Sequence, residues 1–340
     1  MAFRYTASVL FTPLEPVCFR WYGLYTWLTT GPFSQAVSEP LPLPSTLVGA
    51  LIYGLAVAKN RLRSIVRSSA KNSEDLLKDI IELLKLNDCN CSEVALRGPY
   101  IISQKGIALH LMSGHLVVVN DGKLSVVNPM RVVSKGVALR RDAKSTIRHM
   151  LYSVEYVDLI QVLGEYKIVV DILCNESCEL MLEPVIVRLG SDGRAAKMSV
   201  SIMENSLSRI ISEISSSLFY VASPILLSPS HLKTLMNEGS IEIDGFTISA
   251  LSKNELEHLL NEKRDRLVKY FRMKIQMLAT GYDMLRNSLR EMYPAILPGS
   301  VIHMKGGGKE SLLRGLGKYS YAAWGTAVPL KVPETKLASR

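Results

Sequence analysis

Apolar and polar residues alternate over FRYTASVLF at residues 3–11, which predicts a β-strand near the start of the chain. The next apolar block, LVGALIYGLAVA, follows PLPST and is apolar on all sides, which predicts a buried helix capped by Ser45 or Thr46. NSEDLLKDIIELLKL has apolar residues at helical spacing and predicts an amphipathic helix with Ser73 as its cap. The chain is therefore expected to open with one strand and two helices.

From residue 94 to 133 the pattern changes to short β-segments, among which VVVNDGKLSVV predicts a hairpin with an Asp121-Gly122 turn. HMLYSVEYVDLI and EYKIVVDILC predict two further strands. A short helix is expected between residues 179 and 189, with its length limited by Pro184. A glycine turn and a last strand are expected in LGSDGRAAKMSVSIM.

This order of strands and helices, βαββαβ, is that of the ferredoxin-like (RRM-like) fold. We therefore predict an α+β protein whose first ferredoxin-like domain covers residues 1–212, with an insertion of helices and β-hairpins at about 60–148. The remainder repeats the theme less regularly: LFYVASPILL, IEIDGFTIS, LVKYFRMKIQML, PGSVIHMK and YAAWGTAV favour strands, whereas SPSHLKTLM and residues 253–263 favour helices. A second, degenerate ferredoxin-like domain is expected over residues 213–340.

Composition adds a preference for a polyanionic partner. The chain has 340 residues, enough for two domains, and a net charge of +9 with a pI of about 9.2. Its longest apolar run, residues 47–58, is shorter than the ~20 residues a membrane-spanning helix needs. The N-terminus lacks a charged leader followed by a long apolar stretch, so no export signal is expected and a cytoplasmic protein is favoured.

Five cysteines fit a reducing compartment, because their number is odd and no export signal precedes them. The close pairs have spacings C-x-C and C-x3-C, which are not the common zinc-ligand patterns. Free or locally paired thiols are therefore favoured, and neither a metal site nor a cofactor is predicted. The cysteines are Cys18, Cys89, Cys91, Cys174 and Cys178.

A glycine-rich stretch near the C-terminus, MKGGGKESLLRGLGKYSYAAW, carries the strongest candidate site. Glycines let backbone N–H groups approach phosphate oxygens closely, and neighbouring cations neutralise the phosphate charge. The stretch is neither a P-loop nor a G-x-G-x-x-G motif. A flexible, solvated loop is the alternative interpretation. The candidate residues are Gly306, Gly307, Gly308, Lys309, Arg314, Gly315, Gly317 and Lys318.

Further cations recur along the chain, and together with the glycine-rich stretch they favour a surface that follows a phosphate backbone. The candidates are Lys135, Arg140, Arg141, Lys144 and Arg148, and Arg194 within VRLGSDGRAAK. No RNP1-like consensus is present. None of the six histidines stands in HExxH, and no GxSxG occurs, so hydrolase motifs are absent from the sequence.

Four spaced stretches together resemble the RAMP superfamily of CRISPR-associated proteins, and more narrowly the third-subunit family of type III-B (Cmr) effector complexes. They are EPLPLPSTLVGALIYGLA, VALRRDAKSTIRHMLYSVEYVDL, VRLGSDGRAAKMSV and GYDMLRNSLREMYPAILPGSVIHMKG, which runs into the glycine-rich stretch. They extend from about residue 40 to residue 327, and their order and spacing make the resemblance fairly specific.

The resemblance implies a non-catalytic subunit that holds the 5′ handle of the crRNA for antiviral defence. Its implied partners are the large polymerase-like subunit, the first backbone RAMP subunit and, indirectly, the target RNA. Ser45 and Thr46 would meet a phosphate at a helix N-terminus, and the cations at 135–144 would guide the RNA. A hairpin at 117–127 would be the thumb at the handle–guide junction, although Val126 and Val127 also suit a core.

Two other functions remain open at this stage. Some RAMP proteins cleave repeat RNA without a metal ion, which would require a histidine such as His115 or His149 near a 2′-hydroxyl. A packed or surface histidine is the alternative for each. The third interpretation is a scaffold that only binds other subunits, which would suit the positive mean hydropathy of +0.16.

Overall fold

The structure, a computed structural model, is a mixed α+β fold that is rich in β-sheet. Within the described residues, no helix is long and apolar enough to cross a membrane. The structure describes residues 3–21, 35–36, 38–60, 73–86, 89–112, 114–120, 123–139, 146–176, 180–190, 193–213, 216–260, 265–283 and 288–330.

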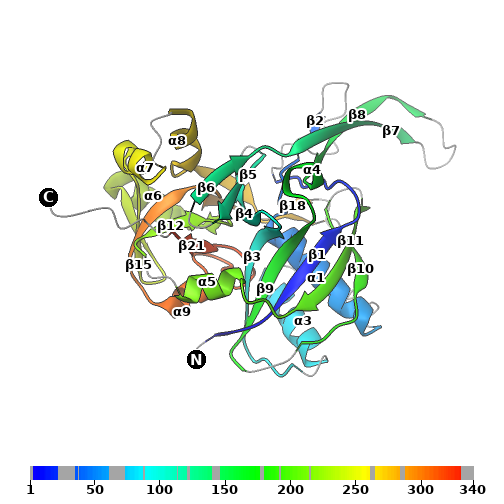
Figure 1. Cartoon of the computed structure of the whole chain (residues 1–340), viewed down its shortest axis with the longest axis horizontal. Coiled ribbons are helices and arrows are strands. Elements are labelled where there is room, and N and C mark those ends of the chain that lie inside the picture. Colours follow the sequence, from blue (N-terminus) through cyan, green and yellow to red (C-terminus); the bar gives the residue numbers. More distant parts are fainter. Residues whose placement is uncertain are drawn as a thin grey trace.

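The larger sheet is antiparallel, with β1 (Arg4–Pro13) beside its centre (Figure 1). Its eight strands have the order β10-β11-β1-β9-β3-β4-β5-β6. The predicted strands at 3–11 and in EYKIVVDILC are confirmed, as is the pairing of the two strands of VVVNDGKLSVV; its predicted turn, Asp121-Gly122, lies outside the described residues. The other bounds are β3 (Val94–Ser103), β4 (Gly106–Leu111), β5 (His115–Asn120), β6 (Lys123–Val127), β9 (Tyr166–Cys174), β10 (Val185–Arg188) and β11 (Ala195–Ser201).

Strand β3 corrects the predicted insertion. It lies inside the range 60–148, yet it pairs with β9 from Val94 to Ser103 and is a central strand of the sheet. Every residue from 94 to 101 is buried, so both faces of this strand are covered. A strand covered on both faces shows a continuous apolar run instead of alternation, which is why the pattern does not separate it from the hairpins that follow.

Helices α1 (Pro44–Ala58) and α3 (Ser73–Lys85) lie side by side, and both pack on β3. The N-cap of α1 is Leu43, so the predicted capping role of Ser45 or Thr46 is wrong. Pro44 occupies the first helical position, where its missing N–H removes no hydrogen bond and its fixed φ suits a helix. Ser45 and Thr46 therefore lie in the first turn.

Two elements differ from the pattern-based assignment. The described part of 179–189 holds the strand β10, whose residues 185–188 pair with β11; the helix expected there is not formed. Pro184 stands directly before this strand, where its missing N–H is tolerated. LVKYFRMKIQML begins inside a helix, α8 (Asp265–Phe271), because Val268 and Phe271 are buried three residues apart on one helix face.

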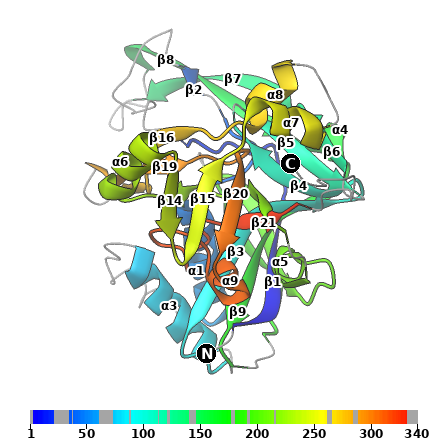
Figure 2. The ribbon, with the colours of Figure 1, turned by 90° about the vertical axis from the view of Figure 1, so that its left-hand side faces the viewer.

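A second, five-stranded sheet is built from the remainder of the chain, in the order β14-β15-β20-β12-β21. Figure 2 shows β14, β15 and β20 of this sheet side by side. The capped helix predicted in SPSHLKTLM is α6 (Pro229–Glu238), whose N-cap Ser228 accepts a hydrogen bond from the N–H of His231. The strand bounds are β12 (Leu218–Val221), β14 (Ser240–Ile243), β15 (Phe246–Ala250), β20 (Val301–Gly306) and β21 (Ala327–Pro329).

YAAWGTAV forms a strand only at β21. The preceding residues turn instead, because Tyr319, Ala323 and Gly325 have positive φ angles of 59°, 65° and 65°, which a β-strand does not allow.

The cysteines link distant parts of the chain. A disulfide joins Cys91 to Cys174 at the end of β9, across 83 positions, and Cys89 is disulfide-bonded as well. The expectation of free or locally paired thiols is therefore wrong for Cys91 and Cys174; Cys178 lies outside the described residues.

The remaining elements complete the fold. They are β2 (Gln35–Ala36), β7 (Met130–Leu139), β8 (Thr146–Asp158), α4 (Ile160–Leu163), α5 (Leu207–Glu213), β13 (Ile225–Leu226), α7 (Lys253–Leu260), β16 (Ile275–Ala279), β17 (Tyr282–Asp283), β18 (Ser288–Leu289), β19 (Met292–Ile296) and α9 (Lys309–Arg314).

The two sheets share their hydrophobic packing. Trp324, from the C-terminal part, is fully buried in the cluster under α1 and α3. Tyr100 of β3 is fully buried in the other large cluster, together with residues of β12 and β20. Because each cluster takes residues from both parts of the chain, the C-terminal sheet is held firmly against the N-terminal one.

Candidate RNA interface

The glycine-rich stretch begins as an exposed turn between β20 and α9. Residues 305–310 are all exposed, and Gly306 and Gly307 have positive φ angles of 81° and 63°. A Cβ on Gly307 would overlap the ring of Phe246, so this glycine serves packing. Gly308 differs, because its φ is −124° and a Cβ there would meet nothing within 4 Å. Gly308 is therefore the glycine of this turn whose backbone is open on the side-chain side.

After α9 the backbone is held in place by close packing and hydrogen bonds. Gly315 and Gly317 have positive φ angles of 85° and 78°, and a Cβ on Gly317 would overlap the carbonyl oxygen of Leu226. The N–H of Gly317 donates to Asp244 Oδ2 at 2.8 Å, and the N–H of Lys318 donates to the carbonyl of Leu226 at 3.0 Å. The interpretation as a flexible, solvated loop is therefore wrong for residues 315–318.

Arg97 of β3 forms hydrogen bonds to residues 313 and 320, on either side of this part of the chain. It is fully buried, and its guanidinium donates to the carbonyl of Leu313 and, at 2.9 Å, to the carbonyl of Ser320. A Cβ on Gly315 would lie 2.7 Å from Arg97 Nη1, so only glycine permits this approach. Burial lowers the pKa of Arg97 to about 9.

Sequence reasoning missed Arg97. The available signal was a single arginine within the apolar run VALRGPYII, because such a charge is rarely buried without partners.

The fixed segment presents a cation beside two aromatic rings. Lys318 Nζ lies 4.2 Å from the ring centroid of Tyr293 and 5.1 Å from that of Tyr319, and it contacts Glu291 Oε2 at 3.8 Å. The two tyrosine rings meet edge to face with centroids 5.9 Å apart. Hydrogen bonds from the hydroxyls of Tyr293 and Tyr319 lower the pKa of Glu291, so its carboxylate stays ionised. Lys318 remains 47% exposed.

The first turn of α1 lies close to this cluster. A Cβ on Gly281 would lie 3.3 Å from Ser45 Oγ, and the N–H of Arg290 donates to the carbonyl of Gly281 at 2.9 Å. Arg290 precedes Glu291, the partner of Lys318. Among the described residues, Arg290 Nε is buried without a hydrogen-bond partner. Ser45 and Lys318, 273 positions apart in the sequence, are thus connected through Gly281, Arg290 and Glu291.

Two predicted cations are engaged within the protein. Arg314 lies within 3.9 Å of Glu93 and 3.7 Å of Glu310, and its guanidinium lies over the rings of Phe3 and Tyr321. Arg194 forms an ion pair with Glu15 and lies 4.1 Å over the ring of Tyr156. These two arginines stabilise the fold, whereas Lys309 is exposed at the start of α9.

A long hairpin, β7–β8, projects from the body of the molecule (Figure 1). Lys135 is exposed on β7, where it faces Ser153 of β8, and the backbone of Arg148 lies in β8. Arg140, Arg141 and Lys144 lie outside the described residues, as does the side chain of Arg148. Three apolar side chains of β7 are exposed on this hairpin, namely Met130, Val132 and Val133.

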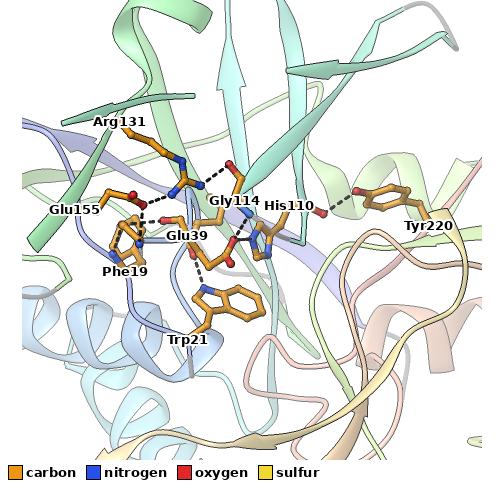
Figure 3. A network of polar contacts seen from close by, with 10 residues as sticks. Phe19, Trp21, Glu39, His110, Gly114, Arg131, Glu155 and Tyr220 are labelled. Atoms are coloured by element: carbon orange, nitrogen blue, oxygen red, sulfur yellow. Dashed lines mark hydrogen bonds and ion pairs between the residues drawn. The ribbon is translucent and has the colours of Figure 1, made fainter. Parts of the chain in front are cut away.

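Buried polar contacts fix the base of the β7–β8 hairpin (Figure 3). Arg131 of β7 forms an ion pair with Glu155 of β8, and Glu155 Oε1 accepts from the N–H of Ser38 at 3.2 Å. Glu39 Oε2 pairs with His110 Nε2 at 2.9 Å and accepts from the N–H of Gly114 at 2.9 Å. These contacts tie the hairpin to the larger sheet and to the chain that precedes α1.

His110 is also tied to both sheets. The indole of Trp21 lies 4.3 Å from the His110 ring, centroid to centroid, and the hydroxyl of Tyr220 in β12 donates to the His110 carbonyl at 2.7 Å. The polar network at the hairpin base is therefore part of the contact between the two sheets.

The proposed thumb at 117–127 does not project. Strands β5 and β6 continue the larger sheet, and Val117 is fully buried while Val126 packs against the same cluster. The hairpin that projects is β7–β8, which the sequence pattern did not single out because its length shows only once the strands are paired.

His115 packs against the ring of Tyr270, with 5.1 Å between ring centroids, which favours the packed interpretation of this histidine. The side chain of His149 lies outside the described residues.

Comparison with known proteins places these features in context. No family model matches the chain. A curated protein of Saccharolobus solfataricus, CRISPR system CMR subunit Cmr3, is 22% identical over 324 residues, covering 86% of this chain and 85% of that protein. A solved chain from the type III-B Cmr-beta complex bound to cognate target RNA has a TM-score of 0.52 at 19% identity, covering 87% of this chain and 86% of that chain, and so shares its fold. The resemblance to the third subunit of type III-B Cmr complexes is thus confirmed over most of the chain.

Proposed function

We propose that this chain is a non-catalytic, RNA-binding subunit of a cytoplasmic type III-B Cmr ribonucleoprotein, where it holds the 5′ handle of the crRNA. The observation that carries the proposal is the rigid segment 313–320, which holds Lys318 against Tyr293 and Tyr319 near the first turn of α1. A half-exposed cation beside aromatic rings suits single-stranded RNA, which is bound by phosphate neutralisation and by base stacking.

The fold proposed for this role is a tandem of two ferredoxin-like domains, at residues 1–212 and 213–340. It is supported by the strand orders β11-β1-β9-β3 and β21-β12-β20-β15, which are equivalent in chain order. When the four strands of each set are numbered in chain order, the first strand lies between the fourth and the third. The RNA would cross the surface where Ser45 of α1 and the glycine-rich segment of the second domain come together.

Gly308 and Lys309 would extend this surface. The N–H groups around Gly308 lie in an exposed turn without a side chain in the way, which suits a phosphate oxygen. Phosphate contacts of this kind position a nucleic acid, whereas base contacts give sequence preference. In the proposed arrangement, Gly308, Lys309 and Lys318 position the handle, and Tyr293 and Tyr319 contact a base.

The β7–β8 hairpin is the proposed thumb and a docking element. Its base is fixed by the Arg131–Glu155 ion pair, so it is held in one direction, and its exposed valines and Met130 suit burial in an assembly. The proposed partners are the large polymerase-like subunit and the neighbouring backbone RAMP subunit, with the target RNA contacted indirectly. Arg140, Arg141, Lys144 and Arg148 would meet RNA along this hairpin.

The test is ultraviolet crosslinking of the complex assembled with crRNA, followed by mass spectrometry of the crosslinked peptides. Handle nucleotides are expected on peptides that contain Tyr293, Gly308 or Tyr319, and nucleotides of the handle–guide junction on residues 135–148. Crosslinks confined to the other subunits would overturn the proposal and leave a scaffold that binds only protein.

A further inference from the structure

A half-buried lysine, Lys274, stands without a counter-ion between α8 and β16. Its backbone is fixed, because its N–H donates to Ser300 Oγ at 3.0 Å and its carbonyl accepts from the N–H of Leu297 at 2.9 Å. Within the described residues, its ammonium group forms no ion pair and no hydrogen bond. Burial lowers the pKa of Lys274, and no neighbouring carboxylate raises it.

Two aromatic rings lie beside this cation. Lys274 Nζ is 5.6 Å from the ring centroid of Tyr270 on α8, and the ring centroid of His115 on β5 is 5.1 Å from that of Tyr270. Tyr270 packs against the hydrophobic cluster that holds residues of β12 and β20, which keeps its ring in place. His115 belongs to the larger sheet, whereas Tyr270 and Lys274 belong to the C-terminal part, so both parts of the chain contribute to these surroundings.

A cation in this position is expected to have an anionic partner. A charge that loses water without meeting an opposite charge costs free energy, so charges that are partly buried are normally paired. The contact with one tyrosine ring compensates only a small part of that loss. The fold alone therefore does not stabilise the charge of Lys274, which indicates an anionic ligand from outside the chain.

The neighbouring charges favour a polyanion as this ligand. Lys269 and Arg272, one position before and two positions after Tyr270, are both exposed. A nucleic acid that places one phosphate at Lys274 would meet this additional positive charge with its adjacent phosphates.

The location also favours RNA. His115 follows Gly114, whose carbonyl accepts a hydrogen bond at 3.3 Å from Arg131 at the base of the β7–β8 hairpin. The cation and its two rings therefore lie next to the base of the hairpin that is proposed as the thumb.

We propose that Lys274 binds a phosphate group of the crRNA where the RNA passes the base of the β7–β8 hairpin. The proposal rests on the proposed function and adds a second phosphate contact to that of Lys318. Lys274 directly precedes β16, and Tyr293, which contacts Lys318, pairs with Leu278 of β16. Positions 274 and 278 are about 13 Å apart along a strand, which a short stretch of one RNA strand spans. A phosphate contact here positions the RNA without selecting its bases.

The first measurement is crRNA binding by the assembled complex at several salt concentrations. Lys274→Met removes the charge and keeps a long apolar side chain. Its crRNA affinity is expected to fall about tenfold, and its slope of log affinity against log salt by about 0.7. Lys274→Arg keeps the charge and is expected to retain the slope. The exposed Lys233→Met on α6 is the charge-matched control, and equal effects of Lys233→Met and Lys274→Met would overturn the proposal.

Thermal unfolding of the full chain without RNA separates binding from a structural role. Because the charge of Lys274 is half-buried and uncompensated, Lys274→Met is expected to unfold at the temperature of the parent or above it. An unfolding temperature below that of Lys233→Met would show that Lys274 serves the fold, and would overturn the proposal.

Acylation of lysine amines, measured by mass spectrometry, identifies the source of the anion. Lys274 is expected to react more slowly in the assembled complex than in the free chain, and to regain its reactivity once ribonuclease has removed the crRNA completely. Protection that survives this treatment would assign the contact to a carboxylate of a neighbouring subunit and would overturn the proposal.

Lys318→Ala, measured in parallel, tests the proposed function separately. Weaker crRNA binding in Lys318→Ala but not in Lys274→Met would overturn the Lys274 contact alone. Unchanged binding in both variants, with no RNA crosslinks on this chain, would overturn the RNA-binding function as well.

Discussion

The guanidinium of Arg97 donates to the carbonyl oxygen of Ser320 at 2.9 Å, across 223 positions of the sequence. The same side chain bonds to the carbonyl of Leu313, so one buried arginine of the N-terminal sheet fixes both ends of the segment that carries Lys318. The N–H of Leu96, next to Arg97, also donates to the carbonyl of Tyr321 at 2.8 Å. The candidate RNA surface is thus formed by the C-terminal part of the chain but positioned by β3.

Arg97→Ala is expected to lower the free energy of unfolding by about 3 kcal/mol, because it leaves the buried carbonyl of Ser320 and the partly buried carbonyl of Leu313 without this donor and opens a cavity. Arg97→Lys keeps the charge but lacks the planar fork that reaches both carbonyls, so an intermediate loss is expected. Chemical denaturation measures the loss, and hydrogen exchange of peptides spanning 313–320 measures local protection. The exposed Arg188→Ala on β10 is the control, with a change within about 0.5 kcal/mol. Unchanged protection of 313–320 in Arg97→Ala would contradict the anchoring role.

Some glycines of the candidate site leave no room for a Cβ, whereas Gly308 does. Gly317→Ala is expected to lose about 3 kcal/mol, because its positive φ and the adjacent Leu226 carbonyl both exclude a Cβ. Gly308→Ala is expected to stay within about 1 kcal/mol of the parent, since its φ of −124° is allowed and no atom opposes the Cβ. Thermal unfolding of the two variants checks the contrast, and equal losses would show that the turn at 306–308 is packed as tightly as residues 315–317.

The burial of Asp171 determines how this residue makes the stability of the fold depend on pH. The carboxylate is fully buried and accepts hydrogen bonds from Ser8 and Tyr100 at 2.6 and 2.7 Å and from the N–H of Ser208 at 2.8 Å. Burial raises its pKa above the ordinary value of 3.8 despite these bonds. As the pH rises above ~4, the Asp171 carboxyl loses its proton in the unfolded chain while it keeps it in the folded protein. The free energy of unfolding therefore falls with rising pH, until the pH passes the folded-state pKa of Asp171.

Asp171→Asn is expected to flatten this fall in stability between pH ~4 and neutrality, although the amide loses the bond from Ser208 and is less stable overall. The measurement is the free energy of unfolding at several pH values for both proteins, with the exposed Glu183→Gln as the control. A parallel pH dependence in Asp171→Asn and the parent would show that this carboxyl does not change its protonation on folding in that range.

The predictable part of the fold is the part with regular apolar spacing. The hairpin β5–β6 and helix α6 follow from alternation, an Asp-Gly turn and a Ser-Pro cap, which are local signals. The pattern does not identify β3 as a central strand, because covering both of its faces removes the alternation. It predicts a strand where α8 forms, because the residues of α8 favour β-structure locally, whereas the burial of Val268 and Phe271 on one face stabilises a helix.

The candidate site was partly predictable. Glycines and cations at 306–318 indicate a special backbone, but which glycines are packed depends on Phe246, Leu226 and Arg97, which are remote in sequence. The sequence pattern does not predict Tyr293 as a site residue either, because its place in the site depends on its contact with Lys318. Long-range partners of this kind are determined by the sheet topology, which a pattern read along the chain does not contain.

Lys318 and Tyr319 are expected to affect RNA binding in different ways. Lys318→Ala in the assembled complex should weaken crRNA binding and reduce the slope of log affinity against log salt by about 0.7, the value for one phosphate contact with a single strand. Tyr319→Ala should cost about 1–3 kcal/mol of binding free energy with little change of slope, because stacking on a base releases no counterion.

Filter binding at several salt concentrations measures both quantities, and the exposed Lys233→Ala on α6 is the charge-matched control. If Lys318→Ala and Lys233→Ala change the slope equally, binding depends on net charge alone, and the cluster of Lys318, Tyr293 and Tyr319 has no specific part in it. A slope change confined to Lys318→Ala, with the Tyr319→Ala loss independent of salt, would place a phosphate and a neighbouring base on this cluster.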